Sequence, residues 1–157
     1  MSQELQLPVY TYEFIPLEKP EGNLFQSKEE IEKHIEDLKL HKQEILQKYI
    51  DRIVKGELVP RMGDKEYRCK TLFHEGGVTI FKMENIKDES YDWNFGVERH
   101  TIGPNCHVII DNRKDMQHIA IERKIKAFSS TNVVKNILCE TLKPLLKSEG
   151  LLLEINP

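Results

Sequence analysis

The sequence contains no hydrophobic run long enough to cross a membrane. Its purely apolar stretches, such as VII at 108–110, are short, whereas a membrane-spanning helix needs about twenty apolar residues. The opening residues, MSQELQLPVY, also lack the basic start and apolar centre of a secretory signal peptide. We therefore expect an intracellular, cytoplasmic protein with no membrane partner.

Cysteine is scarce and unpaired in the sequence. The chain has three cysteines in 157 residues, Cys69, Cys106 and Cys139, and they form no CxxC pair. An odd number at such wide spacing excludes a disulfide framework and a paired-cysteine zinc site. We expect buried free thiols, which behave as small apolar side chains.

No charge of one sign dominates, and the strong catalytic motifs are missing. The formal net charge is −3, which provides no overall field to attract a nucleic acid. The sequence has no glycine-rich phosphate loop, no GxGxxG, no GxSxG and no HExxH. These absences remove the common nucleotide-hydrolysing, dinucleotide-dependent and zinc-peptidase classes as first choices, and we expect no cofactor and no bound metal.

Strand patterns occupy both ends and the middle of the chain. The segment LPVYTYEFIPLEK alternates between Pro8 and Pro16 and is typical of a strand. YRCKTLFH and GVTIFKMEN flank the glycine pair Gly76 and Gly77, which favours a hairpin because glycine adopts positive φ. CHVIIDN and QHIAIERK predict a second hairpin, and LLLEI predicts a last strand.

Two helices are predicted between these strands. SKEE, beginning at Ser27, has the spacing of a capping box, and apolar residues then recur every three to four residues up to Gly56. This helix would reach roughly 40 Å, so we expect it either to bend near residues 40–42 or to project toward a partner. The second helix begins near Ser129 or Ser130 and ends before Gly150, and Pro144 should kink or shorten it.

The order of elements predicts the fold class. Helices do not alternate with every strand, so a parallel sheet is not favoured. We expect a single α+β domain over 1–157, either complete or part of a longer protein. In it a mostly antiparallel sheet is covered by the long N-terminal helix and one C-terminal helix. A ferredoxin-like arrangement with an inserted hairpin fits this order.

The second hairpin carries the candidate catalytic residues His107, Asp111 and His118. A two-residue turn would place Asp111 near Met116 and Ile109 opposite His118. The three candidates would then share a sheet face with Ile109, Ala120 and Glu122. The opposite face would be nearly all apolar and would meet the helices; its residues are Cys106, Val108, Ile110, Ile119, Ile121 and Arg123. Imidazoles beside carboxylates can exchange protons near neutral pH or bind a divalent metal, but a solvated sheet face shows the same pattern.

A further candidate lies in the loop before this hairpin. His100 stands beside Arg99 in a segment that contains glycine and proline. In metal-independent ribonucleases such a histidine moves protons while an arginine or lysine stabilises the phosphorane charge. Several other cations extend this into a candidate phosphate-binding strip: Arg113, Lys114, Arg123 and Lys124. Asp111, Asp115 and Glu122 interrupt the strip, and a solvated charged turn is the simpler explanation.

Two functions are therefore predicted. The first is an assembly domain without catalytic activity, which binds a protein partner or a second copy of itself. It depends on the missing catalytic motifs and on the length of the first helix. The alternative is a domain that binds nucleic acid or processes it without a metal, through the histidine-rich sheet face.

Overall fold

The computed structural model describes residues 6–17, 28–86 and 103–157. Within these ranges the chain forms a six-stranded sheet, a small two-stranded sheet and two helices. The elements, in chain order, are β1 (Val9–Pro16), α1 (Lys28–Val54), β2 (Arg61–Met62), β3 (Lys65–Glu66), β4 (Cys69–Glu75), β5 (Val78–Glu84), β6 (Asn105–Asp111), β7 (His118–Ile121), α2 (Thr131–Ser148) and β8 (Leu151–Asn156).

The large sheet is antiparallel throughout, which confirms the predicted α+β class. Its strand order is β4-β5-β6-β7-β1-β8, and every neighbouring pair is antiparallel. If β2 to β5 are left out, the elements run β1, α1, β6, β7, α2, β8, which is the βαββαβ succession of ferredoxin-like arrangements. The β4–β5 hairpin therefore widens the sheet beside β6.

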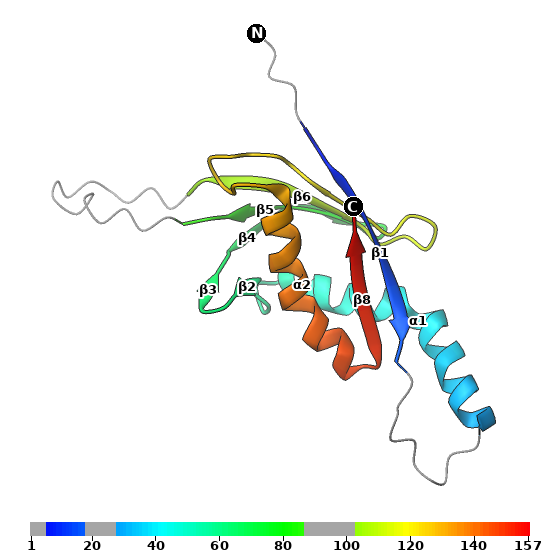
Figure 1. The fold of residues 1–157 in the computed structure, drawn as a ribbon. Coiled ribbons are helices and arrows are strands. Elements are labelled where there is room, and N and C mark those ends of the chain that lie inside the picture. Colours follow the sequence, from blue (N-terminus) through cyan, green and yellow to red (C-terminus); the bar gives the residue numbers. More distant parts are fainter. Residues whose placement is uncertain (1–5, 18–27, 87–102) are drawn as a thin grey trace, which may run out of the picture.

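Both helices pack on one face of this sheet (Figure 1). Strict alternation decides which strand residues face them: in β1, Tyr10, Tyr12 and Phe14 are buried while Val9 and Thr11 are exposed. The hairpin residues predicted to face the core are buried too, namely Val108, Ile110, Ile119 and Ile121. The core thus lies between one sheet face and the two helices.

Helix α1 contacts the sheet through its C-terminal half. Its buried side chains begin at Leu38 and are otherwise Leu46, Tyr49, Ile50 and Ile53, and residues 28–37 contain none. Figure 1 shows the first part of the helix extending past the end of β1 and the helix changing direction midway. The proposed capping residue Ser27 lies outside the described residues. Neither described helix has an apolar stretch long enough to span a membrane.

Helix α2 runs past its internal proline. Ser130 is the N-cap residue, but its side chain makes no capping hydrogen bond, and the helix continues through Pro144 to Ser148. Pro144 is exposed, so water can satisfy the carbonyl group that the proline leaves without a helical donor. Gly150 follows with a φ of +86°, the left-handed conformation typical of a helix end.

Candidate functional site

The β6–β7 hairpin pairs its residues differently from the prediction. Asp111 lies opposite His118 and Ile109 opposite Ala120, so the expected pairing of Ile109 with His118 is wrong. The cause is a six-residue connection, 112–117, in place of a two-residue turn. Its last residue, Gln117, has a φ of +47°. Because the pairing shifts by two residues, the predicted face of each side chain is retained.

His107 and Glu122 form one pair at the sheet surface. The ring Nδ1 atom of His107 lies 3.0 Å from Glu122 Oε1, and the backbone amide of His107 donates to the same oxygen at 3.1 Å. Burial alone would raise the pKa of Glu122, but these two hydrogen bonds and the charge of Lys124 together hold it below its usual range. Glu122 is therefore an ionised hydrogen-bond acceptor and is poorly suited to act as a general acid at neutral pH.

Asp111 forms a separate pair with Arg113. The guanidinium of Arg113 donates from Nε to Oδ1 at 2.8 Å and from Nη2 to Oδ2 at 2.7 Å. These hydrogen bonds hold the pKa of Asp111 below its ordinary value, and the charge of His118 acts in the same direction. Both oxygen atoms of the Asp111 carboxylate thus accept hydrogen bonds within the hairpin. The guanidinium of Arg113 already has a carboxylate partner where a phosphate would bind.

Asp111 and His118 lie directly opposite each other on β6 and β7, but His107 does not join them. His107 and Asp111 are four residues apart on β6, about 14 Å in a strand, and Ile109 lies between them on the same face. Among the residues that the structure describes, no three His, Cys, Asp or Glu side chains gather as metal ligands do. His100 and Arg99 lie outside the described residues, so the structure does not place them.

The remaining basic candidates are exposed and spread along the chain. Lys114 lies in the connection between β6 and β7, and Arg123 donates from Nη1 to Gln6 Oε1 at 3.2 Å. Lys124 lies close enough to Glu122 to lower its pKa. The cations of this region thus alternate with acceptors.

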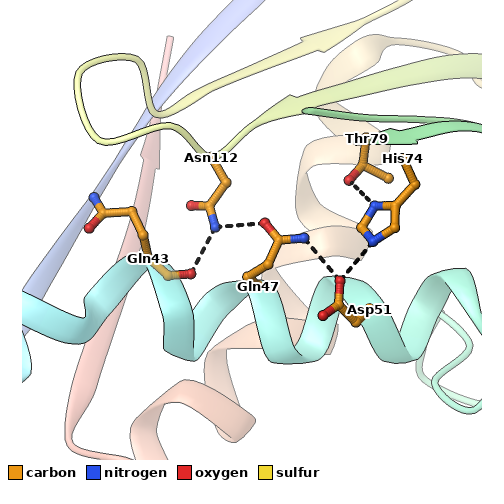
Figure 2. Close-up of polar contacts among 6 residues, drawn as sticks. All are labelled: Gln43, Gln47, Asp51, His74, Thr79 and Asn112. Atoms are coloured by element: carbon orange, nitrogen blue, oxygen red, sulfur yellow. Dashed lines mark hydrogen bonds and ion pairs between the residues drawn. The ribbon is translucent and has the colours of Figure 1, made fainter. Parts of the chain in front are cut away.

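The densest described polar cluster joins α1 to the sheet, and sequence patterns did not indicate it. His74 of β4 lies with its Nε2 atom 2.8 Å from Asp51 Oδ1 and its Nδ1 atom 2.9 Å from Thr79 Oγ1 (Figure 2). This hydroxyl–imidazole–carboxylate chain resembles a catalytic triad in composition. However, Thr79 is only 1% exposed, so its hydroxyl cannot reach a substrate, and the chain acts as a structural clamp.

Asn112 extends the same clamp to the second hairpin. Its Nδ2 atom donates to Gln43 O at 2.9 Å and to Gln47 Oε1 at 3.1 Å, and Gln47 in turn donates to Asp51 (Figure 2). Its Oδ1 atom accepts from the Tyr12 hydroxyl at 2.8 Å. Burial raises the pKa of Tyr12, so this phenol stays protonated and remains a donor.

The face of the sheet that points away from the helices, which we call the open face, carries a row of apolar side chains. No helix packs on it in the described part of the chain. The residues lie side by side across five strands and form what we call the apolar row: Phe73, Ile80, Ile109, Ala120 and Val9. Its two ends are the most exposed, with Phe73 at 44% and Val9 at 53%. Sequence patterns placed Ile109 and Ala120 on this face but could not align them with residues of β4, β5 and β1.

Two shallow hollows lie along α1, and His107 and His118 line neither of them. One is lined by Glu44, Gln47, Lys48, Asp51, Arg52 and Lys55. The other is lined by Glu30, Lys33, His34, Glu36, Asp37 and Leu40. Neither includes His107, Asp111 or His118, so neither could bring a small substrate to these residues.

No protein-family model matches this chain, and no curated protein or solved structure matches it significantly.

Proposed function

We propose that this chain is an intracellular protein-interaction domain without catalytic activity, and that it binds its partner through the open face. The observation that carries this proposal is the apolar row, which crosses five strands on a face where neither of the two described helices packs. Exposed side chains of this kind in one continuous band are typical of a binding surface. The free thiols of Cys69, Cys106 and Cys139 suit a reducing compartment.

Two features support binding over catalysis. His107 and Asp111 are held in separate pairs with Glu122 and Arg113, so they lack the mutual geometry that a nucleophile and its base require. The apolar row, in contrast, has side chains ready to be buried. Covering a half-exposed phenylalanine or valine contributes roughly 1 kcal/mol to binding, so the row and its neighbours form an adequate centre for an interface.

The test uses a photo-crosslinking residue, p-benzoylphenylalanine, in place of Phe73. A matched control carries the same residue at Ile125, which is exposed and lies in the connection between β7 and α2. After irradiation in cells, we expect a discrete protein adduct from position 73 and not from position 125. The substitution Ile109→Asp should abolish it, since a charge in the centre of the row opposes burial, while the circular dichroism spectrum stays unchanged.

Two results would overturn the proposal. One is the absence of any adduct from position 73. The other is the same adduct from both positions, because binding would then not depend on the open face.

A further inference from the structure

The open face carries two pairs of like charges at opposite corners. Lys70 of β4 lies directly opposite Lys82 of β5, and Glu13 of β1 lies directly opposite Glu154 of β8. Like charges in directly opposed positions of an antiparallel pair destabilise the sheet. No ion pair to another described residue relieves either of them. The isolated chain thus retains two unfavourable contacts of opposite sign on one surface.

The strand register places these pairs on either side of the apolar row. On the open face Lys82 is the next residue after Ile80 along β5. Glu13 is the second residue after Val9 on that face, and it lies toward the opposite end of the strands. With strands about 4.8 Å apart and same-face residues about 6.8 Å apart, the two corners are separated by roughly 19 Å across the strands and roughly 20 Å along them. The apolar row runs between the corners.

We infer that the partner of the open face is a second copy of this chain, packed face to face. The inference rests on the function proposed above and names its partner. A two-fold axis in the plane between the two copies exchanges the corners, so that the lysine pair of each copy meets the glutamate pair of the other. The match occurs twice, as the symmetry of an isologous dimer requires. Each corner then supplies the counter-charge that the other lacks.

The geometry of this exchange agrees with known sheet packing. The two corners are separated by nearly equal distances across the strands and along them, so the two-fold axis lies at about 45° to the strands. The strands of the two copies then cross at about 90°, which is one of the two common sheet-on-sheet arrangements. The axis passes between β6 and β7, about equally close to Ala120 and to Asp111, and the charge of Asp111 is already balanced by Arg113. Alanine is the smallest side chain in the apolar row, so the sheets can approach closely at the centre.

The test is a pair of charge reversals analysed separately and mixed. Lys70→Glu with Lys82→Glu makes both corners negative, and Glu13→Lys with Glu154→Lys makes both positive. Each variant keeps a like-charge pair at the altered corner, so the cost to the folded monomer is similar to that in the natural chain. Urea unfolding of each variant verifies this and serves as the control for folding.

The wild-type chain should have twice the monomer mass of 18.4 kDa in sedimentation equilibrium. Each reversed variant alone should associate at least about a hundredfold more weakly, since opposed like charges cost several kcal/mol. An equimolar mixture of the two variants should regain the dimer, because each negative corner then meets a positive one. High salt should weaken the mixed dimer by screening these contacts.

Three outcomes would overturn the inference: a wild-type chain that is monomeric across the concentration series, reversed variants that dimerise as well as the wild type, or a mixture that stays monomeric. An adduct from position 73 that contains a different protein would also overturn it. That last result would leave the proposed function standing, whereas the absence of any adduct would remove both.

Discussion

Replacing Asn112 by alanine should destabilise the fold by about 2–3 kcal/mol. The side chain is 4% exposed and makes three hydrogen bonds, two of them to α1 and one from Tyr12. Each hydrogen bond contributes about 1 kcal/mol net. The Tyr12 hydroxyl keeps the Asp111 carbonyl as a second acceptor at 3.1 Å, so the loss should not include a fully unsatisfied buried hydroxyl.

Urea unfolding followed by circular dichroism measures this change. The midpoint should fall while the slope with urea concentration stays constant, since the surface exposed on unfolding is nearly the same. The matched control is Asn132→Ala at an exposed position in the first turn of α2, which should alter stability by less than about 0.5 kcal/mol. Hydrogen exchange should show the loss of protection in the C-terminal half of α1.

A double-mutant cycle with Gln47→Ala tests the reasoning directly. The two side chains share a hydrogen bond of 3.1 Å, so the combined loss should be smaller than the sum of the single losses by about 0.5–1 kcal/mol. If Asn112→Ala costs less than about 0.5 kcal/mol, or if the two changes are simply additive, the polar clamp does not hold α1 on the sheet.

Further predictions concern the hairpins, a thiol and the alternative function. Gly77→Ala should destabilise the fold by about 1–2 kcal/mol in thermal unfolding, because φ is +81° and the new Cβ atom would lie 3.1 Å from Arg113 Cγ; an unchanged Tm would contradict this. Hydrogen bonds from Arg113 lower the pKa of Asp111, so its carboxylate stabilises the fold above its ordinary pKa and this contribution is lost as the pH falls. Asp111→Asn should therefore destabilise the protein at neutral pH and progressively less below about pH 4, and an equal effect at all pH values would refute it. Burial raises the pKa of Cys106 to about 12, so this thiol should resist iodoacetamide at mildly alkaline pH until the chain is unfolded in urea; rapid labelling of the folded chain would be the contrary result. Labelled RNA and single-stranded DNA should not bind at low salt, where electrostatic binding is strongest, and saturable binding there would favour the nucleic-acid alternative.

Local patterns were sufficient to predict the elements that lie within one stretch of chain. Alternation between Pro8 and Pro16 predicted β1, and the glycine pair at 76 and 77 predicted the β4–β5 hairpin. Alternation also placed His107 and His118 on the face away from the core. These predictions succeed because period two and positive φ are properties of neighbouring residues along the chain.

The exact pairing of distant residues could not be predicted in this way. The register of β6 and β7 depended on a six-residue connection whose conformation includes a positive φ at Gln117, and no glycine marks that position. His74 and Asp51 belong to a strand and a helix, and they are too far apart in the sequence for a local pattern to pair them. Such contacts depend on how whole elements dock, and short sequence patterns do not encode docking.

Sequence patterns alone predicted both helices and the longer strands, and alternation assigned the faces of β1, β6 and β7, because these features follow from the repeat of apolar side chains. The short strands β2 and β3 were not predicted. Only the tertiary structure decided which strands are neighbours and in what register. That register aligns Phe73, Ile80 and Ile109 in one row, and it brings Lys70 opposite Lys82. The alternation of side chains along a strand shows which face a residue lies on, but not which residues of the neighbouring strands lie beside it. A binding surface is made of residues that lie side by side.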